Sequence, residues 1–295
     1  MFKLQGIYAP IPTPFEANGD IAWGKLESNA KFLTDSSIDG IVVMGSNGEF
    51  VTLSHEEKKQ LITKVCELAK GKKKVAVGCG CESTRQTIEL CEHAAKAGAD
   101  AALVLNPNYY KGAMKENLYK TFYQDVADAS PIPVVVYNMP GNTGVNLSGA
   151  LTASLAKHPN IVGVKDTSGN IVQIAEIIRD TENDGFGVFA GSTGFFYATV
   201  ALGGAGGTLA LANIMPEECV QLYKLIKENK HDEAAKLQKK LLAINAAITS
   251  GFGIAGLKAA MEMIGLYGGP PRRPLLPLSE DDRKTVKAIF DAARS

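Results

Sequence analysis

The sequence predicts an α/β protein, a closed (β/α)₈ TIM barrel that is followed by a C-terminal helical extension. Eight short apolar segments alternate along the chain with helical stretches, which favours parallel strands joined by crossover helices. The length of 295 residues is normal for one such barrel. An open doubly wound sheet also fits the alternation, but the even spacing and the absence of a convincing dinucleotide-binding loop favour the closed barrel.

Each expected strand is short and apolar on both faces, as a strand between a barrel interior and a layer of helices should be. The glycine cluster at residues 203–207 precedes the last of these segments, so it is expected to form a tight helix-to-strand turn rather than a phosphate-binding loop. In chain order the expected strands are Gly6–Ala9, Gly40–Met44, Val75–Gly78, Ala101–Leu105, Val134–Asn138, Ile161–Lys165, Gly187–Ala190 and Gly207–Leu211.

Capping signals place several of the helices between these strands. Ser54 with Glu57 has the pattern of a capping box at a helix start. A helix over residues 83–97 is expected to end at Gly98, and Pro216 suits the first turn of a helix that runs to residue 227. Two more helices are expected over residues 148–157 and 170–180.

Beyond the eighth unit the sequence predicts only helices. These cover residues 231–250, 255–264 and 279–293, and a segment rich in glycine and proline precedes the last of them. No long flexible linker divides the chain. We therefore expect a barrel over residues 1–228 and a helical extension over residues 229–295.

The composition excludes several classes of function. The chain has 45% hydrophobic and 21% charged residues, which is typical of a globular protein with a large core. Its 31 basic residues balance its 31 acidic residues, so nucleic acid and anionic membranes are not expected partners. The chain starts with no signal-peptide pattern and has no apolar run long enough to span a bilayer. We therefore expect a cytoplasmic protein.

Cysteine and histidine usage indicates neither a disulfide framework nor a metal site. The five cysteines are odd in number, and their spacing fits no known framework of bridges. The four histidines are scattered and add no ligands at the spacing of a zinc site. Reduced and mostly buried thiols are expected, with no bound metal.

The most informative residue is Lys165, because it ends an otherwise apolar strand. Active sites of α/β barrels lie at the carboxyl ends of the strands. There a lysine is partly removed from water, which disfavours the ammonium form, and a neutral amine can attack a ketone to form an imine. The alternative is a surface lysine paired with Asp166.

Two further strand ends carry suitable chemistry. Tyr137 could transfer protons at an imine, although a buried structural tyrosine is the commoner case for such a residue. The run Gly45–Gly48 offers backbone N–H groups and two short polar side chains that could hold a carboxylate. A plain tight turn is the alternative for this run.

The sequence carries two sets of motifs beside these residues. The first set is Pro12–Phe15, Gly45–Glu49, Tyr137–Pro140, Gly163–Asp166 and Ala212–Asn213. The second set is Phe50, Gly80–Thr84, Asn142–Gly144, His158–Gly163, Phe252–Ile254 and Gly256–Lys258. The first set resembles the dihydrodipicolinate synthase / N-acetylneuraminate lyase family of class I aldolases, along almost the whole chain. The second set makes the chain most similar, within that family, to the 4-hydroxy-2-oxoglutarate aldolases.

The resemblance implies catalytic roles for three residues. Lys165 would form the imine with a 2-oxo acid such as pyruvate, and Tyr137 would relay protons during imine formation and C–C cleavage. Tyr109 would reach into the site of a neighbouring subunit, which implies a homo-oligomer that is usually a dimer of dimers. No cofactor or metal is implied, because the imine itself withdraws electrons from the adjacent carbon.

The resemblance also implies a set of substrate-binding residues. Ser46 and Asn47 would hold the carboxylate of the 2-oxo acid, while Thr167, Gly191 and Ser192 would line the pocket. All of them follow expected strand ends.

Two departures from the family pattern bear on the substrate. Dihydrodipicolinate synthases have a threonine pair where Ser46 and Asn47 stand, and an arginine where Asn142 stands. That arginine would bind a second carboxylate through a bidentate contact that asparagine cannot make. Both departures argue against the condensation of pyruvate with aspartate semialdehyde.

The expected activity is therefore the reversible cleavage of 4-hydroxy-2-oxoglutarate to pyruvate and glyoxylate. The alternative within the family is dihydrodipicolinate synthase or another 2-oxo-acid lyase. The alternative that is not an enzyme is a sensor that binds a 2-oxo acid without turning it over. The presence of Lys165 and Tyr137 argues against this alternative.

Overall fold

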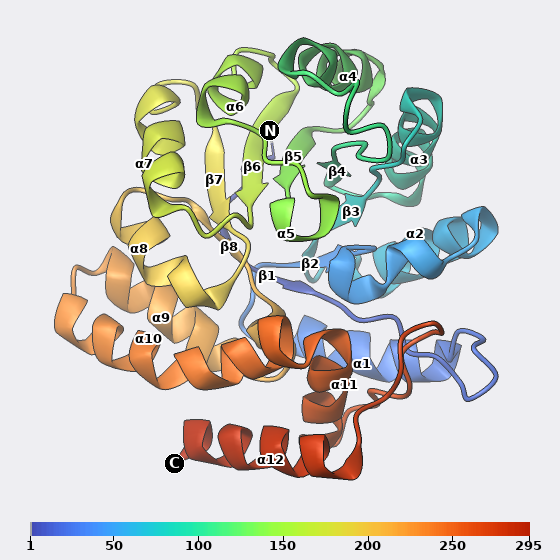
Figure 1. Cartoon of the computed structure of the whole chain (residues 1–295), viewed down its shortest axis with the longest axis vertical. Coiled ribbons are helices and arrows are strands. Elements are labelled where there is room, and N and C mark those ends of the chain that lie inside the picture. The colour runs from blue at the N-terminus through green and yellow to red at the C-terminus, as the bar shows by residue number, and fades with distance from the viewer. Residues whose placement is uncertain (1) are drawn as a thin grey trace.

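The computed structural model describes residues 2–295 and contains a closed barrel of parallel strands in sequential order, β1 to β8 (Figure 1). This confirms the predicted fold class. The strands are β1 (Gly6–Pro10), β2 (Gly40–Val43), β3 (Lys74–Gly78), β4 (Ala101–Leu105), β5 (Val134–Asn138), β6 (Ile161–Asp166), β7 (Gly187–Ala190) and β8 (Gly206–Thr208).

A ring of helices surrounds the barrel (Figure 1). The helices that accompany the strands are α1 (Trp23–Asp35), α2 (His55–Ala69), α3 (Thr84–Ala97), α4 (Glu116–Ala129), α5 (Pro140–Thr143), α6 (Gly149–Leu155), α7 (Ile171–Asp180), α8 (Phe196–Ala201) and α9 (Pro216–Lys227). The capping box of Ser54 and Glu57 is present at the start of α2, and Gly98 ends α3 in the left-handed conformation, as predicted.

The strands are apolar on both faces because each face meets a different core. Inward-pointing side chains, among them Tyr8, Leu103 and Phe189, form a small cluster inside the barrel. Outward-pointing side chains pack with the helices in a much larger cluster. Since neighbouring residues of a strand point to opposite faces, this arrangement fixes which residues at the strand ends can reach the barrel mouth.

The ring closes between β1 and β8, where Gly6 pairs with Gly206. A carbon added at Gly206 would lie 2.0 Å from the carbonyl oxygen of Gly6, so no side chain fits at this contact. Gly206 also has φ of 156°, which favours glycine. The glycine cluster therefore serves strand closure, in agreement with the helix-to-strand turn that was predicted.

Four strands end at other residues than predicted. β1 and β6 each extend one residue further, to Pro10 and Asp166. β2 ends at Val43, because Met44 adopts a left-handed conformation with φ of 58° and turns the chain. β8 was expected over residues 207–211, but it covers only Gly206–Thr208, and Ala210–Asn213 forms a 3₁₀ turn. The apolar run continues through this turn because its residues are buried.

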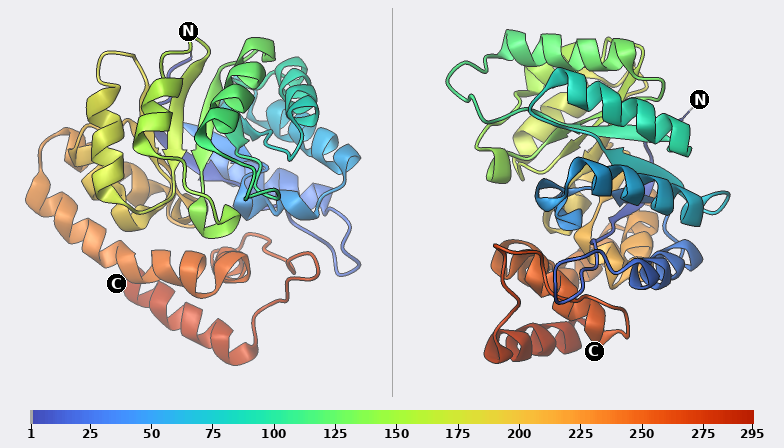
Figure 2. Two further views of the ribbon diagram at one scale, coloured as in Figure 1. Left: turned by 45° about the horizontal axis from the view of Figure 1, so that its top comes forward. Right: turned by 90° about the vertical axis from the view of Figure 1, so that its right-hand side faces the viewer.

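The chain after α9 forms three helices that pack together on one side of the barrel (Figures 1 and 2). They are α10 (His231–Ala246), α11 (Gly253–Met263) and α12 (Glu280–Arg294). The helix predicted over residues 231–250 is interrupted, because Ala247–Gly251 forms a π-helical turn. The proposed division at residue 228 falls between α9 and α10 and stays a proposal.

Arg272 ties the segment before α12 to the loop after β1, and these two segments lie side by side (Figure 1). Its guanidinium donates to the carbonyl oxygens of Gly19 and Thr52, and its carbon lies 4.4 Å from the ring centroid of Phe15. Two hydrogen bonds of 2.6 and 2.8 Å join it to the carboxylate of Glu57. The C-terminal helices are thus held against the barrel by a planar, bidentate contact.

This contact predicts a pH-dependent loss of stability. The Arg272 guanidinium holds the pKa of Glu57 at about 2, below its ordinary value of 4.5. A carboxylate whose pKa is lowered by folding stabilises the folded state above pH 4.5, and this stabilisation is lost as the pH falls toward 2. After allowance for solvent screening we expect a contribution of about 1–2 kcal/mol. Urea unfolding between pH 5 and pH 2 should show a smaller decrease for Glu57→Gln than for the wild type.

The neighbouring Glu56 provides a matched control, because it lies on the same helical turn and is not bonded to Arg272. Glu56→Gln should follow the wild-type pH profile. An equal profile for Glu57→Gln and the wild type would show that the ion pair contributes nothing.

All five cysteines are free, and four of them are buried, as predicted. Burial raises the pKa of the Cys66 thiol to about 12, which makes it unreactive at neutral pH. Within residues 2–295 no helix has the length and apolar character that crossing a membrane requires.

Candidate active site

A cavity of about 820 Å³ opens at the carboxyl ends of the strands. The barrel supplies one part of its wall and the C-terminal helices supply the other, through residues such as Leu242, Asn245 and Thr249. Most of the residues singled out from the sequence line this cavity, namely Ser46, Asn47, Tyr137, Lys165, Thr167, Gly191 and Ser192.

Lys165 lies near the end of β6 and is only 4% exposed. Its neighbour Asp166 points to the opposite face of the strand, where its carboxylate accepts hydrogen bonds from Asn138 and Gln173. The alternative prediction, a surface lysine that pairs with Asp166, is therefore wrong. The amine instead lies in the wall of the cavity, where it can meet a ligand.

Tyr137 lies beside Lys165 because the two residues are register partners on β5 and β6. The Nζ atom of Lys165 is 4.0 Å from the ring centroid of Tyr137. The phenol hydroxyl is 3.1 Å from the Oγ atom of Ser46, and either oxygen could be the donor. An amine and a hydrogen-bonded phenol thus face the same space, as an imine-forming reaction with proton transfer requires.

The loop at residues 45–49 is more than a plain turn, because it presents side chains to the cavity. Ser46–Gly48 forms a 3₁₀ turn after β2. The Nδ2 atom of Asn47 and the Oγ1 atom of Thr167 are buried and have no hydrogen-bond partner among residues 2–295. Buried polar atoms are almost always paired. Both residues line the cavity, so a polar ligand bound there is the candidate partner for these two atoms.

Ser192 is connected to the C-terminal helices through Asn245 on α10. The Nδ2 atom of Asn245 donates to Ser192 Oγ over 3.2 Å. Ser192 Oγ in turn accepts the backbone N–H of Gly194 at the next turn. The loop after β7 is thus fixed by a residue that lies beyond the barrel.

Gly191 lies where two strands crowd together at the cavity wall. A carbon added at Gly191 would lie 2.0 Å from Thr167 Oγ1 and 2.9 Å from the carbonyl oxygen of Asp166. We expect Gly191→Ala to lower the free energy of unfolding by about 1–3 kcal/mol, because the crowded neighbours must move. It should also weaken pyruvate binding, because Thr167 is displaced.

Urea unfolding and titration with pyruvate check this prediction. Gly141→Ala is the control for stability, because a carbon added there meets no atom within 4 Å. The free energy of unfolding of Gly141→Ala should stay within about 0.5 kcal/mol of the wild type. Unchanged stability in Gly191→Ala would contradict the crowding argument.

Tyr109 is not brought into the cavity of its own chain. Its side chain is 77% exposed in the turn after β4, and its ring packs edge-on against Tyr110 with a centroid distance of 5.1 Å. The backbone N–H of Tyr109 donates to the Glu82 carboxylate over 2.9 Å, which fixes the turn.

The sequence reasoning missed the contribution of the C-terminal helices to the site. Asn245 and Thr249 carried no motif, and their place in the wall follows only from the packing of α10 on the barrel. A buried ion pair between Glu49 and Lys258 was missed as well, although both residues belong to the quoted markers.

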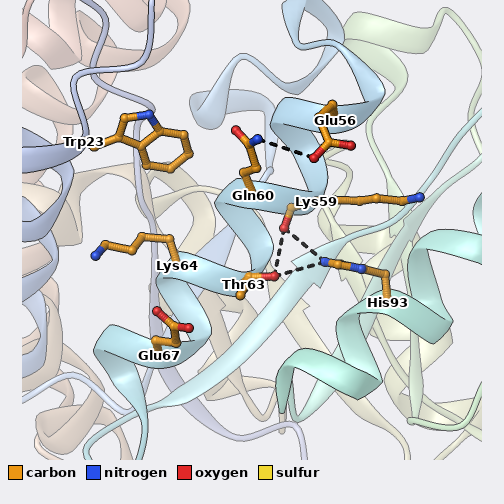
Figure 3. Close-up of a pocket in the computed structure, with 8 residues that line it drawn as sticks. All are labelled: Trp23, Glu56, Lys59, Gln60, Thr63, Lys64, Glu67 and His93. Carbon is orange, nitrogen blue, oxygen red and sulfur yellow. Dashed lines mark hydrogen bonds between the residues drawn. The ribbon is translucent and has the colours of Figure 1, made fainter.

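A second hollow, of about 460 Å³, lies on the outer surface beside α2 (Figure 3). Two pairs of its polar side chains bind one another, and Lys59 and Lys64 bind carboxylates outside it. Gln60 donates to Glu56, and His93 lies 3.1 Å from the hydroxyl of Thr63 (Figure 3). None of the residues predicted for catalysis line it, so the barrel mouth is the better candidate for the active site.

Comparison with known proteins identifies the family of this chain. The model of the dihydrodipicolinate synthetase family matches residues 3–293. A probable mitochondrial 4-hydroxy-2-oxoglutarate aldolase of Emericella nidulans is 38% identical, over 97% of this chain and 94% of its own length. An L-threo-3-deoxy-hexylosonate aldolase of Hypocrea jecorina is 40% identical, over 98% of this chain and 95% of its own.

The structural comparison gives the same family. A dihydrodipicolinate synthase of Acinetobacter baumannii, solved in complex with pyruvate, superposes with a TM-score of 0.93 at 30% identity over 99% of each chain. The match to the family model covers nearly the whole chain, and the relatives are aldolases and synthases. The chain therefore belongs to the dihydrodipicolinate synthetase family and is a class I, pyruvate-dependent lyase.

Proposed function

We propose that this enzyme cleaves 4-hydroxy-2-oxoglutarate reversibly to pyruvate and glyoxylate, with Lys165 as the imine-forming residue and Tyr137 as the proton relay. The observation that carries the proposal is the buried Lys165 amine, 4.0 Å from the ring centroid of Tyr137 in the wall of the barrel-mouth cavity. The name of the Emericella nidulans relative supports the choice of substrate.

The reaction begins when the neutral amine of Lys165 attacks the C2 carbonyl of the substrate. Tyr137 gives a proton to the departing C2 oxygen, which leaves as water, and a protonated imine remains. Tyr137 then takes the proton of the C4 hydroxyl. The C3–C4 bond breaks, its electron pair moves into the imine, and glyoxylate leaves.

An enamine of pyruvate is now bonded to Lys165. It gains a proton at C3, and water hydrolyses the resulting imine to release pyruvate and the free amine. No further electron sink is needed for these steps, because the imine nitrogen accepts the electron pair. In the proposed binding mode Asn47 and Ser46 hold the substrate carboxylate, and Thr167, Gly191 and Ser192 complete the pocket.

The lining of the cavity bears on how a second carboxylate of the substrate is held. Asn142 lies in the cavity wall, where an arginine would offer that carboxylate a bidentate contact. Asparagine offers only a neutral amide there. Glyoxylate carries a carboxylate, as aspartate semialdehyde does, so in the proposed complex this group is held by neutral hydrogen bonds.

An aldehyde panel tests this function. Pyruvate is supplied with glyoxylate, aspartate semialdehyde or L-glyceraldehyde, and consumption of each aldehyde is followed. We expect glyoxylate to be consumed with the highest kcat/KM. Preference for the semialdehyde would identify a synthase, and preference for glyceraldehyde would identify a sugar-acid aldolase. Binding of pyruvate without turnover of any aldehyde would favour the 2-oxo-acid sensor.

We also propose that the active form is a homo-oligomer, arranged as a dimer of dimers, in the cytoplasm. The exposed pair of Tyr109 and Tyr110 supports this assembly, because such aromatic surface is typical of an interface. In this arrangement Tyr109 enters the site of the neighbouring subunit. Sedimentation of the wild type and of Tyr109→Ala checks the assembly, and cell fractionation checks the location.

A further inference from the structure

A second lysine, Lys258 on α11, is buried near the active site and has no role in the steps above. It is 1% exposed, and its Nζ atom lies 2.6 Å from Glu49 Oε1 in an ion pair whose partners are both buried. The amine also donates to the carbonyl oxygen of Pro270 over 3.0 Å and lies 4.7 Å from the ring centroid of Phe15. The Lys258 amine is therefore surrounded by a carboxylate, a carbonyl oxygen and an aromatic ring, which together favour its ammonium form at this position.

Burying an ion pair of this kind costs free energy, because both charges lose their hydration. Burial lowers the pKa of Lys258, and the charge of Glu49 opposes this effect. The Oε1 atom of Glu49 makes no well-directed hydrogen bond, so the ammonium charge is what compensates it. Removing one partner leaves the other as an isolated charge in the protein interior.

Glu49 ends the loop that carries the proposed carboxylate-binding residues. Its second oxygen accepts the backbone N–H of Arg272 over 2.7 Å, so both carboxylate oxygens are held by the C-terminal segment. Glu49 has φ of 54°, a left-handed conformation that is uncommon for a residue other than glycine. Its backbone N–H donates to the carbonyl oxygen of Ser46 over 3.1 Å. The anchored side chain thus maintains an unfavourable backbone conformation on which the loop depends.

This loop in turn supplies two groups to the cavity. Ser46 Oγ is 3.1 Å from the hydroxyl of Tyr137, and Asn47 Nδ2 is buried in the cavity wall with no partner in the described part of the chain. A shift of the loop would move both groups relative to Lys165. Misplacement of such groups by about 1 Å can lower the rate of a reaction by about 10²-fold.

We propose that Lys258 is a positioning residue: through Glu49 it holds the loop at residues 45–49 in the conformation that binds the carboxylate of the 2-oxo acid. The C-terminal helices thus form part of the cavity wall, and through Lys258 they also hold the loop that binds the substrate. This inference rests on the proposed Schiff-base function.

Borohydride trapping of the pyruvate imine tests the inference, because it reports binding and imine formation without the aldehyde. Lys258→Met keeps an unbranched side chain of similar length and removes the charge. We expect the pyruvate concentration for half-maximal trapping to rise about tenfold or more. The trapping rate at saturating pyruvate should fall by a smaller factor, because Lys165 and Tyr137 remain in place. Glu49→Gln should change both quantities in the same direction.

A purely structural role for Lys258 would lower stability without this effect on pyruvate. Val286→Ala provides the matched control, because Val286 is fully buried on α12 and lies outside the cavity wall. This variant should have a lower Tm and an unchanged half-maximal concentration.

Four outcomes separate the possibilities. A folded Lys258→Met protein with wild-type half-saturation overturns the inference, and so does an equal weakening of pyruvate binding in Val286→Ala. If Lys258→Met does not fold, Glu49→Gln decides by the same criterion, since it keeps the size of the side chain. Failure of the wild type to trap pyruvate would instead overturn the proposed function itself.

Discussion

Lys165→Met is expected to lower kcat by about 10⁴-fold or more, the scale that accompanies loss of a covalent nucleophile. Methionine fills nearly the same space but cannot form an imine. The loss should therefore appear without unfolding, since the side chain is packed in the wall of the cavity. Measurement of pyruvate release from 4-hydroxy-2-oxoglutarate, together with mass spectrometry after borohydride treatment, checks both parts of the prediction.

The control for this variant is a surface lysine that forms an ion pair. Lys157 lies 2.7 Å from Asp184 on the surface, and its side chain is 66% exposed. Lys157→Met should keep wild-type kcat, and its pyruvate imine should be trapped normally. A borohydride-stable adduct in Lys165→Met would show that a different amine performs the chemistry.

Tyr137→Phe is expected to lower kcat by about 10²–10⁴-fold, the usual contribution of a positioned general acid–base group. The phenyl ring keeps its contact with Lys165, while the hydrogen bond to Ser46 is lost. The imine should still form, but slowly. Stopped-flow kinetics and time-resolved borohydride trapping should therefore show slow accumulation of the adduct, with the same final amount as in the wild type.

A structural tyrosine serves as the control here. Tyr123 is buried, and its hydroxyl donates to the carbonyl oxygen of Val104 over 3.1 Å. Tyr123→Phe should lower the free energy of unfolding by about 1–3 kcal/mol and leave kcat nearly unchanged. If Tyr137→Phe also loses only stability, the proton relay must lie elsewhere.

The places of Lys165 and Tyr137 could be predicted because each belongs to a short apolar strand with clear ends. β4, β5 and β7 have the predicted bounds, and β6 is one residue longer than predicted. Once strands are placed in a barrel, their carboxyl ends must meet at one mouth.

Other features could not be read from local patterns. β8 has only three residues, and the apolar side chains that follow it are buried by a 3₁₀ turn, so the strand was placed too far along the chain. The π-helical turn at residues 247–251 interrupts an otherwise regular helical pattern. Glu49 and Lys258 are distant in sequence, and only tertiary packing brings their charges together.

The division of the cavity wall between the barrel and the later helices has a consequence for engineering. The covalent chemistry is proposed for strand ends, whereas Asn245 and Thr249 belong to the chain beyond α9. Grafting that later segment from a relative that keeps the Lys258–Glu49 pair is expected to alter which aldehyde is accepted and to leave the reactive amine intact. Selectivity and reactivity would then be inherited as separate modules of one polypeptide.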